Sequence, residues 1–124
     1  MKRLCFGFIL LAVGCSQKTP DCKSVHDGKF IITDPGFKCQ ITRNDGIQIE
    51  QGKDFKTQFD VEWKDDCHYT LKNRKSLSGD ETNDWKPENE FLVEITEVTS
   101  DRIFFTMTAN FTDARIDSSM KILE

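Results

Sequence analysis

Few side chains in this sequence are suited to metal binding or acid–base chemistry. His26 and His68 are its only histidines, and His68 stands beside Asp66 and Cys67, a combination of ligand types that zinc sites use. Neighbouring side chains on a strand point to opposite faces, so we expect His68 on the solvent-facing side, away from Cys67. His26 lies in a polar segment ahead of the first expected strand. We therefore predict a solvated His68 and no metal site.

Nucleophilic and carboxylate chemistry is equally poorly supported. No serine lies in a Gly-x-Ser-x-Gly turn, and nucleophilic catalysis needs a serine or cysteine in register with a base. Asp60 and Glu62 could flank a cleft as paired carboxylates, but their spacing places both on the wet face of one strand. We expect no catalytic residue, no cofactor and no enzymatic activity.

The five cysteines bring the most definite chemistry. Cys22, Cys39 and Cys67 belong to the expected folded region, which gives one disulfide and one spare thiol in an oxidising compartment. The sequence alone does not fix the pairing. We favour Cys22–Cys67, because Cys22 opens the folded region and Cys67 opens a strand. Cys39 would then be a small buried apolar residue. The alternative is a reactive redox thiol, although no Cys-x-x-Cys motif is present.

The other two cysteines lie in or next to an N-terminal segment that has the features of a targeting signal. Lys2 and Arg3 precede an uncharged, mostly apolar run of 10 residues, Leu4 to Val13. A transmembrane helix needs about 20 apolar residues, so this run is too short to span a bilayer. We assign residues 1–14 to a signal peptide, with which Cys5 is lost on cleavage.

Cys15 directly follows this segment and is the expected lipidation site. The sequence Ala12-Val13-Gly14-Cys15 resembles the bacterial lipobox, although Ala12 stands where leucine is commonest. Two or three acyl chains on Cys15, palmitate among them, would hold the protein on a membrane, whereas a single chain binds only marginally. Residues 15–23 would form a lipidated tether. The alternatives are secretory cleavage after Gly14 without acylation and an uncleaved membrane anchor.

Arg43, Trp85 and Phe104 are the candidates for contact with a ligand or partner. Arg43 shares the expected inward face of its strand, where a cation could hold an anionic ligand. Alternatively, it reaches solvent at the strand end or pairs with a carboxylate. Trp85 stands alone in an acidic segment. It is a candidate for an interface anchor or for a lid on one end of the fold. Phe104 and Phe105 are adjacent, so one faces outward, in a contact patch or in a second small core.

Alternating apolar and polar residues indicate the strands that position these side chains. The clearest segment is 55–64, where every second residue is apolar or threonine and the others are charged or glutamine. Asp34-Pro35-Gly36 and Asn44-Asp45-Gly46 are turn signals. Further strands are expected at residues 29–33, 37–43, 47–50, 67–72, 91–96, 103–109 and 120–123.

Residues 73–89 and 112–117 are polar and lack periodicity, so we expect connections there. Seven or eight strands joined mostly by short turns imply antiparallel pairing in a meander. Curling into a barrel removes the exposed edges of such a sheet. We predict a single all-β domain over residues 24–124, built as a curved sheet or a small lipocalin-like barrel.

Composition limits the classes of partner. The chain has 17 basic and 21 acidic residues, and loss of residues 1–14 leaves 110 residues with 15 basic, 21 acidic and a net charge of −6. An acidic domain lacks the basic stripe that nucleic acid requires, so we expect no nucleic-acid partner. The negative net charge also disfavours close contact with anionic lipid head groups. The length suits one domain with a modest core, and we expect a monomer.

The order of several motifs is informative. Residues 22–72 contain Cys22, Gly28-Lys29-Phe30, Ile41-Thr42-Arg43-Asn44, Gln48-Ile49-Glu50, Phe59-Asp60-Val61-Glu62-Trp63 and Cys67-His68-Tyr69-Thr70-Leu71. This series resembles a group of small lipoproteins of unknown function from the Bacteroidota. Some members look to carry a topoisomerase label, which we reject here, because a secreted acidic domain with one inward-facing tyrosine is no DNA-cleaving enzyme. The resemblance implies a fold and a location in the cell envelope, and it implies no functional residue.

Together these features favour a lipid-anchored, non-catalytic envelope module that binds a protein partner or adds to envelope structure. One alternative is a carrier with a cup of about 300 Å³ or more, reached past Trp85 and lined by Arg43. Another is an inhibitor of an envelope enzyme, which would use residues 73–89 to plug a cleft. In the resembling group an acidic stretch after the acylated cysteine goes with surface export. Ser16-Gln17-Lys18 has none, so we expect the periplasmic face.

Overall fold

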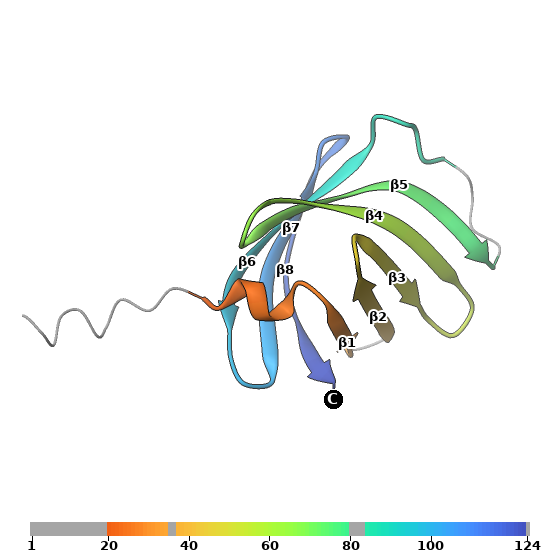
Figure 1. Ribbon diagram of the computed structural model, residues 1–124. Coiled ribbons are helices and arrows are strands. Elements are labelled where there is room, and N and C mark those ends of the chain that lie inside the picture. Colours follow the sequence, from red (N-terminus) through yellow and green to blue (C-terminus); the bar gives the residue numbers. More distant parts are fainter. Residues whose placement is uncertain (1–19, 35–36, 80–83, 124) are drawn as a thin grey trace, which may run out of the picture.

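Eight antiparallel strands form a closed barrel in the computed structural model, which describes residues 20–34, 37–79 and 84–123 (Figure 1). Each strand pairs with its neighbours in chain order, and the last strand closes against the first. The predicted all-β meander is confirmed, and it takes the closed form. The strands are β1 (Gly28–Ile32), β2 (Cys39–Asn44), β3 (Ile47–Gln51), β4 (Lys56–Asp65), β5 (His68–Ser78), β6 (Glu90–Val98), β7 (Arg102–Ala109) and β8 (Thr112–Leu123).

The core consists of side chains that alternate inward along the strands. The alternation predicted for residues 55–64 is confirmed, because Phe59 is 3% exposed and both Val61 and Trp63 pack against the core. All buried apolar residues of this cluster lie between Cys22 and Met120, so the described part of the chain from Cys22 onward contains its own core, barrel closure and disulfide. They are Cys22, Val25, Phe30, Cys39, Ile41, Phe59, Tyr69, Leu71, Val93, Ile95, Ile103, Phe105 and Met120.

The β2–β3 hairpin has the turn that the sequence predicts. Asp45 and Gly46 both have positive φ, at 52° and 81°, as a two-residue type I′ turn requires. Asp and Gly tolerate this region better than other residues, so the turn fixes the register of the two strands. The Asp45 amide also donates to Asp27 Oδ1 at 3.2 Å, which ties the turn to the segment before β1.

The prediction that residues 73–89 form one long loop is wrong in its first part. β5 continues to Ser78 and pairs with β4 up to Lys56. Asn73 has a φ of 53°, and the register shifts there by a bulge opposite β4. Asn73 Nδ2 donates to Asp60 Oδ2 at 2.8 Å. Residues 75–78, beyond the bulge, are all exposed, so this part of the strand shows no alternation of apolar and polar residues.

The predicted connection at residues 112–117 is also a strand. β8 runs from Thr112 to Leu123, and its first half pairs with β7 alone, since β1 meets only Lys121, Ile122 and Leu123. Residues 112–117 are all exposed, so burial imposed no alternation of apolar and polar residues that could have marked the strand.

The two ends of the barrel differ. A short 3₁₀ helix, η2 (Cys22–Val25), leads into β1 and lies at one end, which we call the closed end (Figure 1). In a meander alternate connections share an end. The β2–β3, β4–β5 and β6–β7 turns therefore also lie at the closed end. The β1–β2, β3–β4, β5–β6 and β7–β8 connections surround the other end, which we call the open end.

The predicted signal peptide and Cys15 lie outside the described residues. Within the described ranges, no helix has the length and apolarity needed to cross a membrane.

Candidate functional site

Arg43 secures η2 against the closed end of the barrel. Its side chain is 2% exposed, which confirms the inward direction inferred from strand parity. Nε donates to the carbonyl of His26 and Nη2 to the carbonyl of Val25, both at 2.8 Å. The last carbonyls of a short helix lack donors within the helix, so Arg43 supplies the hydrogen bonds that they need.

The rest of the guanidinium contacts polar and aromatic groups inside the barrel. Nη1 donates to Gln48 Oε1 at 2.9 Å and to the Tyr69 hydroxyl at 3.2 Å. The guanidinium carbon lies 4.9 Å from the ring centroids of Phe30 and Tyr69 and 5.6 Å from that of Trp63. The alternative that Arg43 reaches solvent or pairs with a carboxylate is therefore wrong, because its side chain is buried and its hydrogen-bond partners are carbonyl, amide and phenol oxygens. Burial raises the pKa of Tyr69, and the neighbouring cation partly offsets that rise.

The favoured Cys22–Cys67 disulfide is present and joins η2 to the turn before β5. The Cα atoms of the two cysteines are 5.2 Å apart. His26 stacks on Trp63 beside it, with ring centroids 3.4 Å apart, and its Nε2 lies 2.8 Å from the carbonyl oxygen of Asp66. The closed end is thus a covalently fastened plug, and the part that His26 plays in it had no sequence signal.

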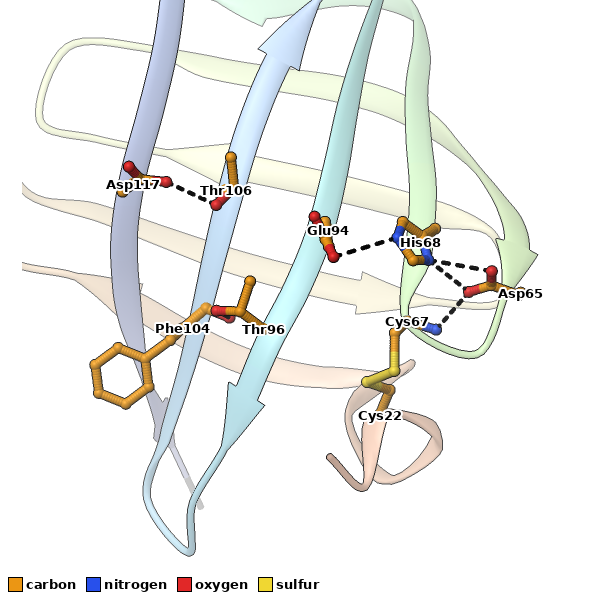
Figure 2. Close-up of polar contacts among 9 residues, drawn as sticks. All are labelled: Cys22, Asp65, Cys67, His68, Glu94, Thr96, Phe104, Thr106 and Asp117. Carbon is orange, nitrogen blue, oxygen red and sulfur yellow. Dashed lines mark hydrogen bonds and ion pairs between the residues drawn. A yellow bond between two sulfur atoms is a disulfide. The ribbon is translucent and has the colours of Figure 1, made fainter. Parts of the chain in front are cut away.

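His68 lies on the outer wall, as predicted, between two carboxylates (Figure 2). Its Nδ1 is 2.8 Å from Asp65 Oδ1 and its Nε2 is 3.6 Å from Glu94 Oε2. The hydrogen bond that His68 Nδ1 donates to Asp65 is the main cause that raises the pKa of His68, and the charges of Asp65 and Glu94 add to the rise. The described residues contain no group of three or more His, Cys, Asp or Glu arranged to hold a metal ion.

The half of the barrel toward its open end, away from the η2 plug, is hollow. A cavity of about 260 Å³, which we call the inner chamber, occupies the interior between β1, β2, β3, β5, β6, β7 and β8. Most of its wall is aliphatic or sulfur-containing, and its polar side chains are Asp34, Gln48, Glu50, Tyr69 and Ser118. The wall includes Ile32, Cys39, Ile41, Gln48, Glu50, Tyr69, Leu71, Val93, Phe105, Met107, Ile116 and Met120.

A second, wider cavity of about 670 Å³ opens at the mouth, and we call it the outer chamber. Trp85 packs there against three phenylalanines, at centroid distances of 5.9 Å from Phe59, 5.3 Å from Phe91 and 5.4 Å from Phe111. This is the arrangement expected of a lid at the barrel end. The chamber is lined by Glu50, Phe55, Thr57, Phe59, Arg74, Asp84, Trp85, Asn89, Phe91 and Phe111.

Gln48 and Glu50 connect the plug to the two chambers. Gln48 Nε2 donates to Glu50 Oε2 at 2.8 Å, while its Oε1 accepts from Arg43. These two contacts fix the direction of the Gln48 amide. Glu50 lines both chambers, so the two cavities adjoin at this side chain.

Cys39 is the free cysteine of the described residues, and it lines the inner chamber. Burial, assisted by the charge of Glu50, raises the pKa of its thiol to about 12. The thiolate is the reactive form of cysteine, so this thiol is inert at neutral pH. The prediction of a small buried apolar residue is confirmed.

The predicted contact residues therefore lie in different places. Trp85 lines the outer chamber, whereas Arg43 lies beneath Gln48 and Tyr69 and lines neither chamber. Phe104 is half-buried on the outer wall of β7, and its neighbour Phe105 points inward.

Apart from Trp85, the sequence did not single out the residues that line the outer chamber, among them Phe55, Asn89, Phe91 and Phe111. Strand alternation indicates whether a side chain points into or out of the barrel, but it does not indicate how far along the barrel axis that side chain lies. The chamber residues could have been found only from their position in the chain, because they lie beside connections that a meander brings to the same end of the barrel.

Comparison with known proteins gives the chain no relative, because no protein-family model, no curated protein and no solved structure matches it.

Proposed function

We propose that this protein is a lipid-anchored, non-catalytic binding protein that holds a small, mainly apolar ligand in the open half of its barrel. One observation carries the proposal: the barrel is plugged at one end and hollow at the other. Ligand pockets are typically about 300–1,000 Å³ in volume, apolar in most of their lining and supplied with a few polar groups. The outer chamber, at about 670 Å³, lies within this range, and the adjoining inner chamber adds about 260 Å³ with a mainly apolar lining.

The geometry favours a different function from the one that the sequence favoured. A filled interior would have favoured a structural module, and the hollow interior favours the carrier. The inhibitor hypothesis loses support, because residues 73–78 belong to β5 and Trp85 packs into the mouth rather than projecting from it. The lipid anchor and the periplasmic address rest on the sequence of residues 1–18.

A protein partner at the mouth is the second candidate. Phe37, Leu77, Phe111 and Ile116 are large apolar residues that are 40–48% exposed, and all lie in or near connections at the open end. Crosslinking of the acylated protein in intact envelopes tests this candidate. A single abundant adduct through the open end would favour it over a carrier.

The carrier proposal is tested with residues 16–124, secreted into an oxidising compartment and titrated with the neutral fluorophore N-phenyl-1-naphthylamine. A Trp63→Phe variant leaves Trp85 as the one tryptophan donor, so energy transfer to the probe reports binding at the mouth. We expect saturable binding with one site and loss of Trp85 emission.

Matched variants locate the site. Phe111→Ala removes an apolar side chain from the outer chamber, and Leu92→Ala removes one of similar exposure from the outer wall, 46% against 43%. We expect Phe111→Ala to weaken probe binding by severalfold and Leu92→Ala to leave it unchanged. Equal binding by both variants, or no binding by the folded domain, would contradict the proposal.

A further inference from the structure

We infer that the ligand is a single-chain amphiphile, with its linear hydrocarbon tail in the inner chamber and a neutral polar head group in the outer chamber. This inference rests on the proposed carrier function and adds the chemical class and the direction of the ligand. The argument follows from the different linings of the two chambers and from the place where they meet.

The inner chamber suits a flexible hydrocarbon chain. At about 260 Å³ it holds the volume of about nine waters, and a methylene group takes up a similar volume, so a tail of about nine carbons fills it. Met107 and Met120 line it, and the thioether side chain adapts its shape to irregular apolar guests. Engineered apolar cavities of about 150 Å³ stay dry and bind benzene, so a larger one is suited to a larger guest.

The polar groups of the inner chamber place no demand on the tail. Gln48 Oε1 and the Tyr69 hydroxyl accept hydrogen bonds from Arg43, and Gln48 Nε2 donates to Glu50. The other two polar residues of the wall pair with each other, since the Ser118 hydroxyl donates to Asp34 Oδ2 at 3.2 Å. Polar groups that already have partners are cheap to cover with hydrocarbon, whereas unpaired ones are costly. A polar head group would gain little by entering this chamber, so it is left at the mouth.

The outer chamber suits a head group. Polar side chains, among them Thr57, Asp84 and Asn89, face the same space as its aromatic side chains. Within the described residues the buried Trp85 Nε1 has no hydrogen-bond partner. A buried donor without a partner is energetically costly, so a small shift of the indole toward a hydroxyl or carbonyl oxygen of a head group would be favourable. Acidic and basic groups both line the chamber, which favours a neutral head group.

The chain offers separate reporters for the two chambers. Met107 and Met120 line the inner chamber, Trp85 lines the outer one, and Trp63 lies at the closed end as an internal control. The experiment is an NMR titration of residues 16–124, with labelled methionine methyl groups and indole N–H groups. The ligands are 1-monoacylglycerols of 6 to 14 carbons, used below the concentration at which they form micelles, and glycerol is the head-group control.

We expect acyl chains to shift the Trp85 indole and both methionine methyl groups, and to leave the Trp63 indole in place. Affinity should rise about fourfold for each added methylene until the chamber is full, at about nine carbons, and then level off. Glycerol should shift none of these signals.

Cys39→Phe projects a ring into the inner chamber, and Cys39→Ala is its matched control. We expect Cys39→Phe to reduce the affinity for a ten-carbon chain at least tenfold while Trp85 still responds to N-phenyl-1-naphthylamine. Cys39→Ala should bind the chain as the wild type does. Retained disulfide and cooperative thermal unfolding establish that both variants are folded.

The outcomes separate the inference from the function on which it rests. Shifts at Trp85 without shifts at Met107 or Met120, or affinity independent of chain length, would overturn the inference and leave a carrier of another ligand. No response of Trp85 to either the probe or the acylglycerols would overturn both.

Discussion

At the scale of single residues, Arg43 is a charged side chain enclosed by acceptors and aromatic faces. It donates to two backbone carbonyls, an amide oxygen and a phenol, and three rings surround it. An enclosed charge is tolerated only when such contacts replace the lost water, and each acceptor in turn depends on the arginine. Arg43 is therefore a stability determinant at the base of the barrel.

Arg43→Lys should destabilise the domain, since an ammonium group cannot reproduce the planar fork of donors. We expect a loss of about 2–4 kcal/mol in the free energy of unfolding, because several acceptors lose their partner. Urea denaturation measures it. Arg115→Lys, at an exposed ion pair, is the control and should stay within about 0.5 kcal/mol of wild type. Equal stability of the two variants would refute the assigned role of Arg43.

The ion pair of His68 makes a prediction about pH. The pKa of His68 is raised in the folded protein, so its contribution to stability is complete below the ordinary value of 6.5 and is lost as the pH rises through the folded value. NMR titration of the imidazole should give a pKa above 6.5 in the wild type and a lower one in Asp65→Asn. The same pKa in both proteins would show that Asp65 is not the cause.

The contacts of single residues were the feature that was hardest to predict from the sequence. Parity indicated that Arg43 points inward, but its main partners are the carbonyls of Val25 and His26, and backbone groups have no signature in the residue types. Trp85 was noticed because it stands alone in an acidic segment. Its packing against Phe91 and Phe111 depends on the closure of the whole barrel, which brings distant segments together.

At the scale of elements, η2 and the disulfide act together as the plug. A helix of four residues has almost no stability of its own, so its position depends on Cys22–Cys67 and on Arg43. The bond closes a loop over a sequence separation of 45 residues. This places the covalent constraint at the closed end and leaves the open end without one among the described residues.

Reduction of Cys22–Cys67 should lower the free energy of unfolding by about 4 kcal/mol, as the chain-entropy model gives for a loop of this length. Denaturant unfolding with and without dithiothreitol measures the change, and a Cys22→Ser/Cys67→Ser variant should match the reduced protein. Cys39→Ser in the oxidised protein controls for loss of a thiol. An unchanged midpoint on reduction would show that the plug does not depend on its bond.

Gly79 directly follows β5 at the open end, and we expect the stability of the domain to be sensitive to substitution at this position. Its φ is 105°, and a Cβ added there would lie 2.5 Å from the carbonyl oxygen of Asp54. Gly79→Ala should therefore destabilise the β3–β4 connection against β5, by about 1–3 kcal/mol. Gly46→Ala is a useful comparison, since its φ is also positive but its nearest atom is 3.9 Å away. We expect the larger loss of thermal stability at Gly79.

Elements with strong alternation were predictable and the others were not. Residues 55–64 and 91–96 alternate cleanly because one face packs on the core, and both were recognised as strands. The second half of β5 and the first half of β8 were missed because residues 75–78 and 112–117 are all exposed. Periodicity reports burial, so a strand without a buried face is invisible to it.

At the scale of the whole molecule, the barrel is closed but not uniformly strong. β1 and β8 are joined over only three residues each, whereas β7 and β8 pair over most of their length. The β1–β8 junction is therefore the weakest part of the sheet. Local openings in a protein begin where the fewest contacts hold neighbouring strands.

Hydrogen exchange tests this gradient. We expect the amides of β8 that pair with β1, within residues 121–123, to exchange faster than those of Leu71 and Val93 at the middle of the β5–β6 pair. The expected difference is at least tenfold in protection factor, and a bound ligand should reduce it. Uniform protection around the barrel would show that closure at β1–β8 is as firm as the other pairings.

The position of the plug has a consequence for orientation in the cell. Cys15 and Pro20 are five residues apart, a span of at most about 18 Å, and Pro20 leads directly into the plug. If the acyl chains attach at Cys15, the molecule stands on its sealed base with its opening turned toward the aqueous side. Under the proposed carrier function, the ligand would then be exchanged with soluble donors or with a facing surface, and not with the leaflet that carries the protein.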